Sequence, residues 1–387
     1  MIARVFILLI VLILLPEWYI YMRYFSRRCK NDKVRKWLCW LPSILMVLYT
    51  IILSLERDFA PEDMSRLNIY LFLLGIWIIP KAVYSLCAVI GRICALLRHS
   101  KKNWGNLIGL VLALYVIFVV LYGSTIGLRR LEIKRVDLSF KDLPASFEGY
   151  RMVLFSDAHV GSMTGSLKKI LERDIDSINA QQPDIILFAG DLQNMQPSEL
   201  YPVQDILMKL KAKDGIYSVL GNHDYSDYIN ADPAIESANE RELVNRQTRF
   251  GWTVLRNERQ VIRRGKDDLV IAGEESGGLK RDTILYDKKK TMEGVKKNSF
   301  VIMMQHDPTV WRKDILPDSI PLTVSGHTHG GQYSFFGVRP TEYTYTEDCG
   351  LYQEGNSYLY VTKGIGALIP FRFAVSPEIV VITLHRK

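Results

Sequence analysis

The first third of the chain consists of long apolar runs separated by short charged loops. Four runs are long enough to cross a bilayer as helices, and they cover residues 2–22, 37–55, 67–90 and 107–123. Trp18 and Tyr19 are typical membrane-interface anchors. The pattern predicts a four-helix transmembrane domain over residues 1–127. A cleaved signal peptide is the alternative for the first run, which however lacks a small-residue cleavage motif and precedes three further runs.

Beyond residue 127 the pattern changes to short β-branched runs that alternate with amphipathic segments. This alternation predicts an α/β domain over residues 128–387. The expected strands are 152–155, 184–189, 216–220, 300–304, 322–324, 359–362 and 378–384. The expected helices are 166–181, 198–213 and 233–249, and the charged stretch 287–297 is expected to be a solvated helix and loop.

Polar motifs follow five of these strands directly, at the point where each strand ends. They are DAH (Asp157, His159), GD (Asp191), GNHD (Asn222, His223, Asp224), QHD (His306) and GHTH (His327, His329). Five of the seven histidines in the chain lie in these positions. Since loops at the carboxyl ends of the strands in an open α/β sheet share one crevice, we expect these side chains to meet.

Each motif is weak evidence alone, but together they supply more carboxylate, amide and imidazole ligands than one ion requires. Two ions about 3.5–4 Å apart, bridged by one carboxylate, would use them all. Cys349 is the only cysteine in the sequence beyond the membrane domain, so the ligand set has no cluster of thiolates. Carboxylate, amide and imidazole ligands favour Mn, Fe or Zn. In an extended GHTH segment both histidines would project to the same side, so each could reach a different ion.

The motif series resembles the calcineurin-like metallophosphoesterase superfamily, whose pattern is D-x-H, G-D, G-N-H-[DE], a lone H and G-H-x-H. The resemblance covers about residues 150–387, and the stretches GLY (350–352), VTKGIG (361–366) and FRF…PEI (371–379) are similar to its bacterial membrane-linked branch. It implies a domain of two mixed sheets packed face to face with helices outside.

The resemblance also implies roles for the motif residues. Asp157, His159 and His329 would hold the first ion, and Asn222, His306 and His327 the second, with Asp191 bridging both. His223 would contact the phosphate or protonate the leaving oxygen, and Asp224 would orient His223. Asn194, three residues past Asp191, is a further polar residue near the site. Arg372 could contact the substrate phosphate, but an arginine near a C-terminal strand is as often a surface ion pair, so it is left outside the site.

These features predict a membrane-anchored phosphohydrolase dependent on two metal ions, which would activate a bridging hydroxide. A phosphodiesterase is the first hypothesis, and the membrane location favours a lipid-linked or envelope phosphate substrate. A phosphomonoesterase or a nuclease could use the same site, and a non-catalytic membrane sensor is the alternative from another class. No G-x-x-x-x-G-K-[ST] loop and no nucleophilic triad is present.

The charge of the chain is unevenly distributed. The net charge is +8, but residues up to 136 carry 19 Lys and Arg against 7 Asp and Glu, whereas the rest carries 30 against 34. A nuclease needs a basic channel, so we expect no nucleic-acid partner. The basic pI therefore belongs to the membrane domain.

The loops between the apolar runs predict the orientation in the membrane. Loops 23–36 and 91–106 are basic and loop 56–66 is mostly acidic. By the positive-inside rule the N-terminus lies outside, and the C-terminal domain lies on the extracytoplasmic side of a multi-pass protein of the cell membrane. The basic residues after the fourth run, Arg129, Arg130, Lys134 and Arg135, argue against this orientation. Lys81, within the third run, is either a functional charge or a side chain that reaches a headgroup or a partner helix.

Overall fold

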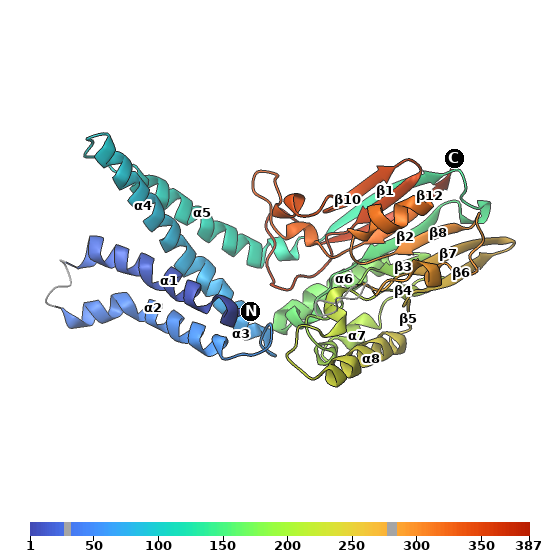
Figure 1. Cartoon of the computed structure of the whole chain (residues 1–387), viewed down its shortest axis with the longest axis horizontal. Coiled ribbons are helices and arrows are strands. Elements are labelled where there is room, and N and C mark those ends of the chain that lie inside the picture. Colours follow the sequence, from blue (N-terminus) through green and yellow to red (C-terminus); the bar gives the residue numbers. More distant parts are fainter. Residues whose placement is uncertain (27–31, 277–284) are drawn as a thin grey trace. The chain divides into compact units, whose positions relative to one another are not determined.

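The computed structural model describes residues 1–26, 32–276 and 285–387, and it divides into two compact units, Met1–Ile126 and Gly127–Lys387 (Figure 1). Part of the predicted basic loop 23–36, including Cys29, lies outside the described residues. Each unit has its own core, and each is described separately below.

The first unit is helical. Its described residues contain four helices that are long and apolar enough to cross a membrane: Ile2–Phe25, Lys33–Ser54, Met64–Leu97 and Gly105–Arg129. They correspond to α1 (Ile2–Ile20), α2 (Lys33–Ser54), α3 (Met64–Leu73) with α4 (Ile79–Leu97), and α5 (Gly105–Thr125). The predicted four-helix transmembrane region is therefore confirmed. The third span is longer than predicted, and a π-helical turn, Leu74–Ile78, separates its two halves directly before Pro80. Pro80 lacks an amide proton, which explains why the regular hydrogen-bond ladder changes there.

Lys81 pairs with a carboxylate inside this helical unit. Its Nζ forms an ion pair with Glu17 of α1, and the hydroxyl of Ser43 in α2 donates to the same carboxylate oxygen at 2.7 Å. Glu17 is only 5% exposed. Of the two alternatives for Lys81, the structure therefore shows contact with a partner helix. The ion pair joins three helices through one carboxylate.

In the part of the second unit that the structure describes, the strands form two six-stranded sheets. The first sheet has the strand order β1-β12-β2-β3-β4-β5, and all its neighbours are parallel except β12 and β2. Its strands are β1 (Glu132–Phe140), β12 (Glu378–Arg386), β2 (Tyr150–Phe155), β3 (Ile185–Phe188), β4 (Ile216–Ser218) and β5 (Trp252–Val254).

The second sheet has the order β10-β11-β9-β8-β7-β6, with a parallel centre and antiparallel pairs at both edges. Its strands are β10 (Gly350–Glu354), β11 (Ser357–Val361), β9 (Leu322–Ser325), β8 (Phe300–Met304), β7 (Asp267–Gly273) and β6 (Glu258–Arg264). Both sheets are mixed, as the resemblance implies.

The main hydrophobic core lies between the two sheets. Leu154 and Leu187 of the first sheet share one buried cluster with Ile302 and Val324 of the second. A second cluster covers the outer face of the first sheet with α6 (Lys168–Ala180) and α8 (Pro233–Arg249). The buried Trp311 belongs to a third cluster over the second sheet. The predicted fold, two mixed sheets face to face with helices outside, is confirmed (Figure 1).

The structure differs from the sequence-based expectation in several elements. The helix predicted over 198–213 is wrong: a short 3-10 turn, Pro197–Leu200, and one helical turn, α7 (Gln204–Leu207), occupy that stretch. Tyr201, before Pro202, still has a helical backbone, but Val203 has a φ angle of −124° and a ψ angle of 0°, so the two turns do not join into one helix. The charged stretch 287–297, predicted as a solvated helix and loop, contains the single helical turn α9 (Lys288–Thr291) followed by a mostly exposed loop. The strands that the sequence did not predict are β1, β5, β6, β7 and β10.

Candidate metal centre

The sequence-predicted site residues come from loops that follow β2, β3 and β4 of one sheet and β8 and β9 of the other. Most of these loop residues adopt a strained backbone. Asp157, His159, Asp191, His327 and His329 all have positive φ angles, between 42° and 76°. Non-glycine residues rarely adopt this conformation, and such strain is concentrated at functional sites. The strained residues therefore lie in the same loops that the sequence motifs identified as the candidate site.

Both histidines of the GHTH segment lie in this left-handed conformation, with φ angles of 76° for His327 and 54° for His329. The expectation that an extended chain projects them to the same side is therefore wrong. The two rings still belong to different groups of side chains, because the turn directs each of them to a different neighbour.

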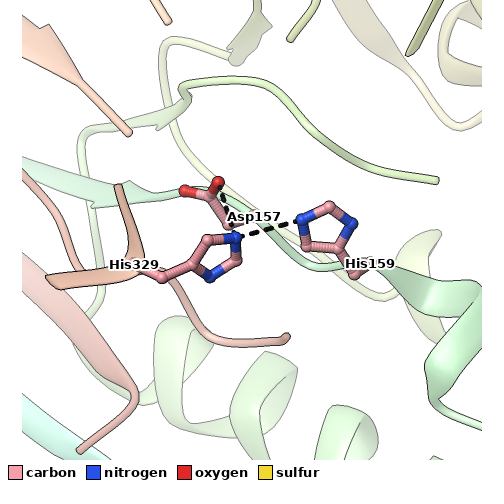
Figure 2. A group of neighbouring side chains, drawn as sticks. All are labelled: Asp157, His159 and His329. Atoms are coloured by element: carbon pink, nitrogen blue, oxygen red, sulfur yellow. Dashed lines mark hydrogen bonds and ion pairs between the residues drawn. The ribbon is translucent and has the colours of Figure 1, made fainter. Parts of the chain in front are cut away.

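The first group consists of Asp157, His159 and His329 (Figure 2). The Nε2 atom of His329 lies 3.1 Å from Nε2 of His159 and 3.4 Å from Oδ1 of Asp157. Burial lowers the pKa of His159 to about 3, so its imidazole is neutral. A neutral ring offers a lone pair, and two ring nitrogens that face one carboxylate form a suitable set of donors for a cation.

The second group consists of Asn222, His306 and His327. The amide oxygen Oδ1 of Asn222 lies 2.9 Å from Nδ1 of His327 and 3.2 Å from Nε2 of His306, and these two ring nitrogens are 3.2 Å apart. The amide nitrogen of Asn222 donates to the hydroxyl of Tyr228 at 2.7 Å, which directs the amide oxygen towards the rings. The Nδ1 atom of His306 lies 2.7 Å from the carbonyl oxygen of Ala189, which leaves Nε2 as the donor atom for a metal.

Asp191 lies between the two groups. Its Oδ2 atom is 3.7 Å from Nε2 of His159 and 3.3 Å from Nε2 of His306. Burial opposes its ionisation, but the imidazoles of His306 and His223 hold the pKa of Asp191 well below its usual range. The Asp191 carboxylate is therefore charged and placed to contact an ion in either group.

The electrostatics of the site fit a pair of cations. Burial disfavours a charged His306, but Asp191 raises the pKa of His306 to about 10. The carboxylates therefore favour a positive charge beside them. When the His306 ring is neutral, a bound cation would supply that charge. The groups contain only nitrogen and oxygen donors among the described residues. This is the donor set of Mn, Fe and Zn sites, so the residues fit the implied metals.

A glycine allows the close approach of these loops. A Cβ atom at Gly221 would lie 2.2 Å from Oδ1 of Asp191, which no real side chain tolerates. The glycine of the GNHD motif is thus required because the Asp191 carboxylate passes against the backbone.

His223 lies at the edge of both groups. Its ring stacks on Tyr228, with 4.2 Å between the ring centroids, and packs edge-on against His159 at 4.8 Å. Its Nδ1 lies 2.7 Å from the backbone carbonyl oxygen of Asn194. A carbonyl only accepts, so Nδ1 carries the proton and the Nε2 atom is the one available to a substrate.

The resemblance implied that Asp224 orients the ring of His223. In the structure the Asp224 carboxylate binds backbone amides instead. The carboxylate accepts hydrogen bonds of 2.9 Å from the backbone amides of Asp191, Leu192 and Gly221, and one of 3.2 Å from Gln193. Asp224 therefore fixes the loop that carries Asp191. The group that orients the ring is the Asn194 carbonyl, which no side-chain motif reveals.

Two further residues that the motifs did not identify support the site. The carboxylate of Glu199 accepts from the backbone amides of Asn194 at 2.6 Å and Met195 at 2.9 Å, and so holds the loop that orients His223. Arg372 is fully buried and donates to the carbonyls of Lys363 at 2.7 Å and Gly366 at 2.5 Å. The alternative of a surface pair for Arg372 is therefore wrong: it holds the loop that follows β11.

Comparison with known proteins gives the same two-part division. Residues 3–128 match the family described as probable calcineurin-like phosphoesterase, transmembrane domain, and residues 150–331 match the calcineurin-like phosphoesterase family. A Danio rerio protein named transmembrane protein with metallophosphoesterase domain is 29% identical over 395 residues, which cover 97% of this chain and 87% of the relative.

Bacterial relatives are similar to a large part of the chain. An uncharacterized metallophosphoesterase of Bacillus subtilis is 31% identical over 62% of this chain and 81% of the relative. An uncharacterized metallophosphoesterase of Aquifex aeolicus is 27% identical over 66% of this chain and 93% of the relative. The similarity therefore extends to relatives from both animals and bacteria.

Proposed function

The chain belongs to the calcineurin-like phosphoesterase family, and on this premise we propose that it is a membrane-anchored phosphodiesterase that depends on two metal ions. One observation carries the proposal: the Asp191 carboxylate lies within 3.7 Å of a ring nitrogen in each of two ligand groups. A bridging carboxylate between two such groups is the arrangement that two-metal phosphoester hydrolysis uses.

We assign the site residues two roles, metal binding and proton transfer. Asp157, His159 and His329 would hold one ion, Asn222, His306 and His327 the other, and Asp191 both. When bound, the ions would supply the positive charge that activates a water molecule and neutralises the phosphate oxygens. His223 would carry the proton for the leaving oxygen at Nε2, because the carbonyl of Asn194 fixes the proton on Nδ1.

A non-catalytic sensor is the alternative from another class. A sensor would be free to lose a ligand or the proton donor, whereas this chain has them all, and the side chains of both ligand groups lie together. A monoesterase or a nuclease would use the same residues. The second unit lacks the excess of basic residues that a nucleic-acid channel needs, which supports a smaller phosphate ester.

We place this activity on the extracytoplasmic side of the cell membrane, because the loops between the spans alternate from basic to acidic to basic. A reporter enzyme fused after Lys387, active only outside the cytoplasm, tests this orientation. An inactive reporter on a stably produced fusion would place the second unit in the cytoplasm.

The activity is tested with the purified full-length chain, stripped of metal and then supplied with Mn²⁺. We expect metal-dependent hydrolysis of bis-p-nitrophenyl phosphate that exceeds hydrolysis of p-nitrophenyl phosphate and is lost in Asp191→Ala. The matched control is His385→Ala, since His385 is an exposed histidine outside the site that pairs with Glu148. Preference for the monoester would make the protein a monoesterase, and no turnover despite bound metal would favour the sensor.

A further inference from the structure

A tight hairpin beside the metal centre presents a phenylalanine to solvent. Phe335 and Val338 exchange two backbone hydrogen bonds of 3.0 Å, so the turn contains only Phe336 and Gly337. Both turn residues have positive φ angles, 52° for Phe336 and 86° for Gly337. Such turns favour Asn-Gly, and a bulky aromatic in the first position is strained. Phe336 is nevertheless 100% exposed, so neither local conformation nor burial within the chain explains its presence.

The exposed phenylalanine belongs to a chain segment with an apolar surface. Among the described residues of the second unit, six of the eleven exposed large apolar side chains lie between positions 333 and 351. The six are Tyr333, Phe335, Phe336, Val338, Tyr343 and Leu351. Four of them are aromatic, and Tyr343 is 84% exposed. Exposed apolar surface gathered in this way marks an interaction site rather than the usual scatter of single residues.

This surface is attached to the loop that carries the metal-centre histidines. The amide of Ser334 donates to the carbonyl of Phe373 at 2.9 Å, and the amide of Phe373 donates to the carbonyl of Gln332 at 3.0 Å. Gln332 lies only three residues after His329. The hydroxyl of Tyr345 lies 3.1 Å from Nε2 of His327. The aromatic segment is therefore held in place beside the metal centre.

A short segment joins the second unit to the candidate membrane spans. The fourth candidate span ends at Arg129 and β1 begins at Glu132. The two residues between them extend over about 10 Å at most, so the second unit is tethered at the membrane surface. Phenylalanine and tyrosine are among the side chains that enter the membrane interface. Both have an apolar ring, and tyrosine also has a polar hydroxyl group.

We propose that the hairpin Tyr333–Val338, together with Tyr343, inserts into the interfacial layer of the bilayer and sets the metal centre at the level of lipid headgroups. The substrate class that follows is the phosphate ester of a membrane lipid. The substrate class rests on the proposed function, whereas the contact with lipid does not. The strained turn at Phe336 is then explained, since the turn exists to present the ring to the membrane.

The contact with lipid is tested by replacing Phe336 with the photoreactive p-benzoylphenylalanine in the full-length chain. The protein is reconstituted in vesicles of phosphatidylethanolamine and phosphatidylglycerol, irradiated and analysed by mass spectrometry. The matched control carries the same group at Met208, which is 53% exposed on another part of the second unit. We expect at least about tenfold more phospholipid adduct at position 336 than at position 208. Equal yields, or adducts with a second copy of the chain or another protein, would overturn the proposal.

The substrate class is tested by comparing two diesters for the wild type and Phe336→Asp. The measured quantity is the turnover of phosphatidylglycerol in vesicles divided by the turnover of bis-p-nitrophenyl phosphate in solution. We expect this ratio to fall about tenfold in Phe336→Asp, and an unchanged ratio would reject lipid esters as the substrate class. If the wild type turns over neither diester, the proposed function fails, and the adduct experiment still decides whether the hairpin contacts lipid.

Discussion

The Nδ1 atom of His223 lies 2.7 Å from the backbone carbonyl oxygen of Asn194, and this contact fixes which nitrogen of the ring can face a substrate. The loop of Asn194 is itself held by the Glu199 carboxylate. The ring of His223, the proposed proton donor, is thus oriented by a backbone group that a buried acidic residue keeps in position, and this separates its proposed role from that of the proposed metal ligands.

This separation predicts that His223→Ala removes activity without removing metal. Loss of a general acid typically lowers turnover by about 10²- to 10⁴-fold. We expect this loss on bis-p-nitrophenyl phosphate, with the metal content of the purified chain unchanged by elemental analysis. Since Nδ1 faces a carbonyl, Nε2 is left for the substrate. A variant that also loses one ion per chain would identify His223 as a ligand instead.

The two ligand groups predict different metal losses. We expect His159→Ala and His306→Ala each to lose one ion, because the His159 ring lies against His329 and the His306 ring against Asn222 and His327. Asp191→Ala should weaken the binding of both ions, since its carboxylate lies between the groups. Metal titration of the stripped full-length chain measures the number of ions and their affinities. Retention of both tight sites in Asp191→Ala would contradict the bridging role.

Glu274 predicts a pH dependence of stability. Burial raises the pKa of Glu274 from 4.5 to about 7, and the amide of Gln305 at 3.2 Å is the hydrogen-bond partner of its carboxylate. Between these values the folded chain keeps a proton that the unfolded chain releases, so the free energy of unfolding falls as the pH rises from about 4.5 to about 7. Glu274→Gln removes this loss and should stabilise the second unit by up to ~3 kcal/mol above pH 7.

Thermal unfolding of the detergent-solubilised chain at about pH 5 and about pH 8 measures the effect. The matched control is Glu258→Gln, because Glu258 lies exposed on β6. A melting temperature of Glu274→Gln that follows the wild type at both pH values would refute the prediction.

The buried pair of Glu17 and Lys81 predicts strong coupling between two helices of the first unit. Lys81→Met should destabilise this unit by about 3–5 kcal/mol, because it leaves the buried Glu17 without its partner. The double variant with Glu17→Gln should recover part of this loss. Thermal stability of the four proteins in one detergent measures the coupling, and Lys101→Met, at an exposed lysine, is the control. Additive losses in the double variant would mean that the two charges do not interact.

The sequence by itself determined the four apolar spans, the α/β pattern and the positions of the polar motifs. Each of these features depends on side-chain type and periodicity, which are local properties of the chain. An apolar run predicts a span wherever it occurs, and a histidine or aspartate after a strand lies at the edge of a sheet. The short edge strands β5 and β10 carried too little pattern to be predicted, and the turns around Pro202 were mistaken for a helix.

Only the tertiary structure decided which motif residues lie close to one another. Asp191 lies between two ligand groups only because loops from both sheets converge, and such distances depend on how the sheets pack. The orienting groups are a backbone carbonyl at Asn194 and backbone amides around Asp224, and every residue carries these groups, so no sequence pattern distinguishes them. The exposure of Phe336 likewise appears only in the folded chain, where the residue lies in a two-residue turn, whereas its side chain alone would predict burial.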